Sequence, residues 1–123
     1  MEKQSGFMLN NDITIKVDSC DYSETIHTIK PESLNLYEYV HGGIYYSLAD
    51  AAAGVASRSN GSNYVTLNSS FNYMHAVREG ILTACGTVVN RTSKICVVHV
   101  DVKNQKGEVV STGTFTMYKV LWK

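Results

Sequence analysis

A single helix-like stretch in a chain of strand-like runs is the strongest constraint on the fold of this sequence. From Gly42 to about Ser59, apolar residues recur at helical spacing, and alanine or glycine fills most of the positions between them. Neighbouring elements can approach such a thin helix closely. Asn60 and Gly61, which follow it, tolerate the left-handed conformation that ends helices. We therefore expect one central helix, closely wrapped by the rest of the chain.

The other segments have the alternation or the apolar content of β-strands. After a polar start, a hairpin is predicted over 13–17 and 22–30, and Pro31 then ends the second strand. Residues 31–40 form a connecting loop. Four further strands are predicted at 64–74, 81–89, 95–103 and 109–121, with a hairpin turn at 104–107. This order predicts an α+β fold in which an antiparallel sheet packs against one helix.

The strand predicted at 95–103 is apolar on both of its faces. Strands of this kind lie in sheets that are covered on both sides. Since the chain has only one long helix, the second cover is either a partner subunit or partly solvent.

Composition and charge exclude several classes of protein. The 123 residues, 1–123, fit a single domain, and 11 basic residues balance 11 acidic ones, so we expect no nucleic acid partner. Cys20, Cys85 and Cys96 are odd in number and widely spaced, which argues against a disulfide framework and a zinc site and indicates reduced core residues. No stretch approaches the roughly 20 apolar residues of a membrane span, and none resembles a signal peptide. We expect a soluble, cytoplasmic protein without a membrane partner.

The residues around the start of the predicted helix indicate a chemistry. Gly42 and Gly43 begin the helix, directly after His41, and Asp50 follows two turns later. The N–H groups at a helix start have no acceptor within the helix, so they can polarise a carbonyl group with the positive end of the helix dipole behind them. A carboxylate nearby can act as general base or nucleophile. These parts suit acyl transfer.

Asn35, His41-Gly42-Gly43 and Asp50 together form a pattern that resembles the PaaI-like branch of the hotdog-fold acyl-CoA thioesterases. Asn35 lies six residues before His41, and Asp50 nine residues after it. The resemblance covers about 13–119. It implies a hotdog fold, a long curved antiparallel sheet wrapped around one central helix, and hydrolysis of an acyl-CoA thioester that carries an aromatic or a short or medium acyl group.

The same resemblance implies roles for individual residues. Asn35 would orient the water or the carboxylate, His41 would bond near the thioester or fix its loop, and Thr66 would hold the attacking water. The family often has glycine three residues after the asparagine, where this sequence has Glu38. We expect this difference to affect which acyl group is accepted more than which reaction is catalysed.

The helix geometry predicts how the site is assembled. Asp50 lies nearly beneath Gly43 on the helix, but about 10 Å further along its axis. One chain therefore cannot easily present both to one carbonyl group. We expect Asp50 to act on a substrate held by the glycines of a second chain, which predicts a dimer with shared sites, with a tetramer as a further possibility.

Other residues carry weaker expectations. Arg91 and Lys94, in a turn between two strands, are candidate contacts for coenzyme A phosphates, with a solvated turn as the alternative. His27 and His75 are expected at the surface, and His99 is expected to be packed or paired. Four tyrosines either line an acyl pocket or reflect β-propensity and interface packing: Tyr37, Tyr39, Tyr45 and Tyr46.

Two other functions on the same fold are open. A non-catalytic acyl-CoA binding or sensing module would need no carboxylate at position 50, and sensors usually carry a DNA-binding segment for which no room precedes the first strand. A hydratase would need Asp-x-Asn-Pro, but Pro31, the only proline, follows Lys30. His-Glu-x-x-His and Gly-x-Ser-x-Gly are both absent from the sequence. We expect no metal and no cofactor beyond the coenzyme A of the substrate.

Overall fold

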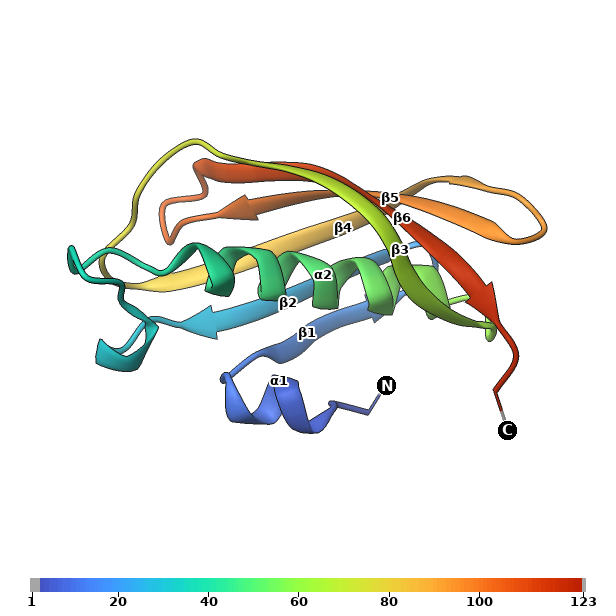
Figure 1. Cartoon of the computed structure of the whole chain (residues 1–123), viewed down its shortest axis with the longest axis horizontal. Coiled ribbons are helices and arrows are strands. Elements are labelled where there is room, and N and C mark those ends of the chain that lie inside the picture. The colour runs from blue at the N-terminus through green and yellow to red at the C-terminus, as the bar shows by residue number, and fades with distance from the viewer. Residues whose placement is uncertain (1–2, 123) are drawn as a thin grey trace.

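The structure, a computed structural model, describes residues 3–122 and consists of one curved sheet around one long helix (Figure 1). The helix is α2 (Gly42–Arg58). The six strands are β1 (Thr14–Ser19), β2 (Tyr22–Thr28), β3 (Asn63–Tyr73), β4 (Ile81–Arg91), β5 (Ile95–Lys103) and β6 (Val109–Val120). They pair antiparallel in the order β1-β2-β4-β5-β6-β3, and the sheet is not closed. This confirms the predicted hotdog fold.

Small side chains let α2 lie deep in the sheet. Leu48, Ala49, Ala52 and Ala53 are completely buried. A Cβ atom added to Gly86 on β4 would lie 3.0 Å from the Ala52 carbonyl oxygen, so only glycine fits there without a shift. The helix stops one residue before the predicted end, and Gly61 has a φ of 88°, the left-handed conformation expected for a helix stop.

The buried face of β2 is polar, unlike the usual inward face of a strand. Ser23 Oγ donates to the Ala52 carbonyl at 2.6 Å, and Thr25 Oγ1 donates to the Leu48 carbonyl at 2.9 Å. His27 is the next residue on this face and is 2% exposed. The expectation of a surface position for His27 is therefore wrong, because the alternation of β2 turns its polar residues inward, where they find hydrogen-bond partners.

A short helix, α1 (Gly6–Asn10), lies within the segment that we expected to be only a polar start (Figure 1). Ser5 Oγ caps it by accepting from Met8 N–H at 3.2 Å, and the Met8 side chain is buried in the core. Five residues cannot sustain a helix alone, so tertiary packing of Met8 explains why no periodic pattern indicated it. The predicted loop 31–40 also contains a turn of 3₁₀-helix, η1 (Pro31–Ser33).

The three cysteines lie in different environments. Cys96 is buried as expected, and burial raises the pKa of its thiol. Cys85 is half-buried, but Cys20 is exposed in the turn between β1 and β2, so its expected core position is wrong. A single apolar side chain in a turn carries no pattern that distinguishes core from surface.

Candidate active site

The start of α2 is capped by the side chain of the preceding residue. His41 has extended backbone angles, and its Nδ1 atom accepts a hydrogen bond from Gly43 N–H at 2.9 Å. A Cβ atom on residue 43 would lie 3.1 Å from that nitrogen, so a side chain there would require the His41 ring to shift slightly. Gly42 N–H has no acceptor among residues 3–122. Of the two expected carbonyl polarisers, Gly42 is thus available directly, whereas Gly43 becomes available only if the His41 ring moves.

Asn35 organises the loop that leads to this helix start. Its Oδ1 atom accepts from the backbone N–H groups of Tyr37 and Tyr39, at 2.9 and 3.1 Å. Glu38 has a φ of 65°, in the left-handed region that favours glycine. The loop therefore keeps a glycine-like backbone at the position where this sequence departs from the family pattern. The role of Asn35 toward water or Asp50 stays a prediction.

Asp50 and Thr66 lie together although they come from different elements. Thr66 on β3 donates a hydrogen bond of 2.6 Å from its Oγ1 atom to Asp50 Oδ1 on α2. The hydroxyl also lies 3.6 Å from the Met117 sulfur. A hydroxyl bound to a carboxylate in this way can orient it and can also offer its own lone pairs to a water.

Both residues open into a groove of about 510 Å³ between α1, α2 and β3. Apolar side chains line much of it: Phe7, Met8, Tyr46, Val65 and Met117. One face of α2 supplies a further wall: Tyr46, Ser47, Asp50, Ala51, Gly54 and Arg58. This face follows the helical period around Asp50 and could have been read from the sequence, whereas the α1 residues carried no such signal.

The predicted site residues do not all meet within one chain. Within residues 3–122, His41, Gly42, Gly43 and Asn35 are not among the residues that line the groove of Asp50 and Thr66. The two halves of the predicted site belong to different regions of α2, as the helix geometry requires.

Arg91 is held by the protein itself. Its guanidinium donates to Asp21 Oδ1 at 2.9 and 3.1 Å and to the Ala56 and Ser57 carbonyls, at 3.2 and 3.0 Å, near the end of α2. Burial alone lowers the pKa of Arg91, but the Asp21 contact and neighbouring groups raise it overall. Arg91 thus joins β4, the β1–β2 turn and the C-terminal end of α2. Lys94 is exposed in the β4–β5 turn.

The four tyrosines have separate environments. Tyr46 lines the groove and its hydroxyl lies 2.6 Å from Ser69 Oγ. Tyr45 is buried and stacks on Tyr73, and burial raises the pKa of its hydroxyl. Tyr37 is exposed, and Tyr39 lies beneath the Arg78 guanidinium at 4.2 Å.

The remaining histidines agree with expectation. His99 is paired with Asp101 at 3.1 Å, and His75 is exposed. In the described part of the chain, no cluster of three or more histidine, cysteine or acidic residues could hold a metal. No helix among these residues is long and apolar enough to cross a membrane.

Known proteins resemble this chain in sequence and in fold. The model of the thioesterase superfamily matches residues 37–111. A protein of Archaeoglobus fulgidus, named as a candidate esterase, is 35% identical over 100 residues, and the match covers 80% of this chain but only 65% of that relative.

Solved structures extend the comparison to the whole fold. A hypothetical thioesterase of Streptococcus pneumoniae, solved with coenzyme A, is 34% identical with a TM-score of 0.83, over 88% of this chain and 85% of that one. A Streptococcus mutans protein bound to acetyl CoA is 29% identical with a TM-score of 0.88, over 98% and 95%. The PaaI protein of E. coli, at 21% identity, has the same fold with a TM-score of 0.91, over 96% and 86%. The chain therefore belongs to the thioesterase superfamily and has the PaaI-like hotdog fold.

Proposed function

We propose that this protein hydrolyses the thioester bond of an acyl-CoA. The observation that carries the proposal is the Asp50–Thr66 pair, a carboxylate and hydroxyl 2.6 Å apart that open into a largely apolar groove. Such a groove suits an acyl chain, and the pair suits activation of a nucleophile at its wall. The Streptococcus proteins solved with coenzyme A and acetyl CoA support the substrate class.

The reaction assigns one task to each part of the site. Asp50 acts as a general base, which takes a proton from water as the water oxygen attacks the thioester carbon, or as a nucleophile, which forms an acyl anhydride that water then cleaves. Gly42 N–H stabilises the negative charge that develops on the carbonyl oxygen. The C–S bond breaks, and coenzyme A leaves as a thiolate that is protonated to the thiol. The acid is the second product.

His41 has a defined tautomer in this arrangement. Because Nδ1 accepts the Gly43 N–H, the ring proton of the neutral imidazole lies on Nε2. The ring therefore presents a donor that can bond to the thioester group while it caps the helix.

We propose further that the site is completed by a second copy of the chain. β3 is an edge strand of 11 residues without a charged residue or proline, and Val65 and Leu67 on it are 51% and 61% exposed. A long, uncharged edge is a template for pairing with another strand. Since Thr66 lies on this edge beside Asp50, a partner paired there would abut the groove, so its helix start could hold the carbonyl group that Asp50 attacks.

Release of free thiol from a panel of aromatic and aliphatic acyl-CoA thioesters tests the activity. Asp50→Asn keeps the size of the side chain and removes its charge, and we expect kcat to fall about 10²–10⁴-fold. Glu79→Gln, which changes an exposed carboxylate in the same way, is the matched control and should behave as the wild type. If the wild type binds the panel without hydrolysing any member, the protein is an acyl-CoA binding module.

Gly42→Pro tests the carbonyl polariser. Proline removes the N–H but suits the first position of a helix, and the extended backbone of His41 is compatible with a following proline. Gly42→Ala keeps the N–H and is the control. We expect a loss of about 10²–10³-fold in kcat for the proline variant alone.

The shared site is tested by mixing inactive chains. If Asp50 and Gly42 act from different chains, exchange of subunits between Asp50→Ala and Gly42→Pro preparations restores about a quarter of the wild-type activity, because half of the dimers are mixed and each has one intact site. Mixing would restore nothing if both residues acted within one chain.

A further inference from the structure

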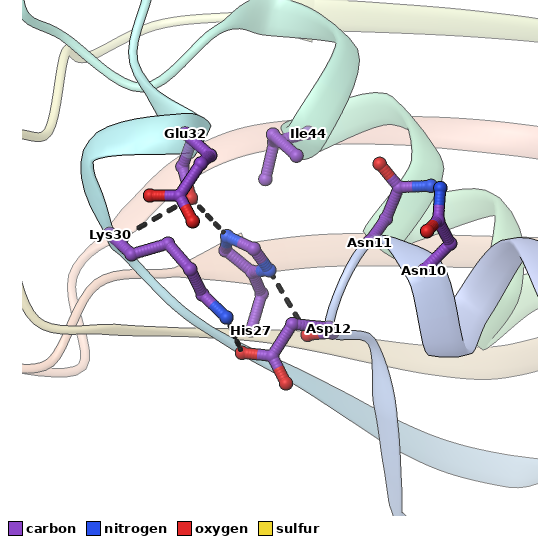
Figure 2. Close-up of a pocket in the computed structure, with 8 residues that line it drawn as sticks. Asn10, Asn11, Asp12, His27, Lys30, Glu32 and Ile44 are labelled. Carbon is purple, nitrogen blue, oxygen red and sulfur yellow. Dashed lines mark hydrogen bonds and ion pairs between the residues drawn. The ribbon is translucent and has the colours of Figure 1, made fainter.

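His27 is a buried titratable residue that has no part in the proposed chemistry. Its ring lies between the segment that follows α1 and the turn η1 (Figure 2). The Nδ1 atom is 3.0 Å from the Asp12 carbonyl oxygen, and Nε2 is 2.7 Å from Ser33 Oγ. Each ring nitrogen therefore has a hydrogen-bond partner within the protein, as a side chain that is only 2% exposed requires.

The partners define the direction of each hydrogen bond. A carbonyl oxygen can only accept, so Nδ1 carries the proton and donates to Asp12. In the neutral tautomer with this proton, Nε2 accepts the hydroxyl proton of Ser33, whose oxygen itself accepts from Lys30 N–H at 3.2 Å. Lys30 and Asp12, which line the same pocket as His27, form an ion pair of 3.0 Å.

Ser33 is the base of the loop that carries two predicted site residues. Its carbonyl oxygen accepts the His41 N–H at 2.8 Å, which closes the loop where α2 begins. Inside this closure Leu34 bridges to Val40, and Asn35 N–H donates to the Tyr39 carbonyl at 2.7 Å. Whatever fixes Ser33 thus fixes the ends of the loop.

We propose that His27 is a positioning residue for the active-site loop. It holds the Ser33 side chain, and through the Ser33 backbone it holds His41 and the start of α2. His27 itself touches no substrate. The catalytic part of this inference rests on the proposed thioesterase function, but its structural part does not.

Two substitutions separate the bonds of the ring. In His27→Gln, the amide oxygen can take the place of Nε2 and keep the Ser33 bond, while the Asp12 bond is lost. In His27→Asn, the amide nitrogen can take the place of Nδ1 and keep the Asp12 bond, while the Ser33 bond is lost. Each variant loses one bond and the aromatic ring, so they form a matched pair.

Amide hydrogen exchange over 34–43 is the first readout, because it needs no substrate. We expect exchange in this segment to be about tenfold faster in His27→Asn than in His27→Gln, as the loss of one hydrogen bond predicts. For the best thioester of the panel, kcat should fall by at least about fivefold in the asparagine variant relative to the glutamine variant, with KM changed less than about twofold.

Ser33→Ala removes the same bond from the other side and serves if a His27 variant fails to fold. It should reproduce the faster amide exchange of His27→Asn. The double variant His27→Asn with Ser33→Ala should exchange little faster than either single variant, since both substitutions break the same contact. Equal exchange in the glutamine and asparagine variants would overturn the inference. If the wild type hydrolyses no thioester of the panel, the proposed function is wrong. The comparison of amide exchange between His27→Gln and His27→Asn would still decide whether His27 positions the loop.

Discussion

Thr66 donates a hydrogen bond of 2.6 Å to Asp50 across the boundary between the edge strand β3 and the central helix α2. The two residues are 16 positions apart in the sequence, and only the packing of the strand beside the helix brings them together. This contact aims one carboxylate oxygen at the hydroxyl and leaves the other oxygen for a water or a substrate.

The hydroxyl of Thr66 is expected to matter more than its methyl group. Thr66→Val replaces the hydroxyl with a methyl group of similar size, and kcat should fall about tenfold because Asp50 loses the donor that orients it. Thr66→Ser keeps the donor and should stay within about threefold of the wild type. Steady-state thiol release measures both. A valine variant with wild-type kcat would reduce Thr66 to a packing residue.

His41 has two expected roles that substitutions can separate. Alanine removes the helix cap, so the free energy of unfolding should fall by about 1 kcal/mol, whereas asparagine, itself a good cap, should preserve it. Both variants lose Nε2–H and should lose activity. Urea unfolding measures the first effect and thiol release the second. If alanine leaves the free energy of unfolding unchanged, the 2.9 Å bond to Gly43 N–H contributes nothing as a cap.

The left-handed backbone of Glu38 predicts that glycine at this position causes no loss of stability. Glycine adopts a φ of 65° without the steric cost of a side chain, but it also adds freedom to the unfolded chain. We expect Glu38→Gly to leave the free energy of unfolding unchanged or to raise it by up to about 1 kcal/mol. Glu38→Ala keeps the strain and should bring no such gain. A glycine variant less stable than the alanine variant would contradict this account.

Substitution of Arg91 is expected to change the stability of the protein, whereas substitution of Lys94 is expected to change KM for acyl-CoA. Arg91→Met leaves Asp21 and carbonyls at the end of α2 without their donor, so the protein should lose about 1–3 kcal/mol of stability. Lys94→Met should leave stability unchanged and raise KM for acyl-CoA, if this exposed cation binds a phosphate.

An acyl pantetheine thioester, which lacks the nucleotide phosphates, is the control for Lys94. The effect of Lys94→Met on KM should disappear with this substrate and should shrink at high salt. An equal rise in KM for both thioesters would remove Lys94 from phosphate binding.

Local patterns in the sequence were enough for the architecture of this protein. The helical spacing of apolar residues between small ones placed α2 to within one residue, and alternation or apolar content placed the six strands. The glycines at the start of the helix were also visible, because this signal depends on neighbours within a few positions. The predicted strand over 22–30 ends at Thr28, where the chain turns toward η1.

Tertiary structure alone decided the contacts between distant segments. A polar residue on β2 has no local pattern that marks it as buried, so the position of His27 depended on the Asp12 carbonyl and on Ser33. In the same way, the sequence offered Arg91 as a candidate phosphate contact or as part of a solvated turn, and only the fold places its guanidinium against Asp21 and the end of α2. Periodicity determines which face of an element is apolar, whereas the partner of a polar group depends on which segments the fold brings within hydrogen-bond distance.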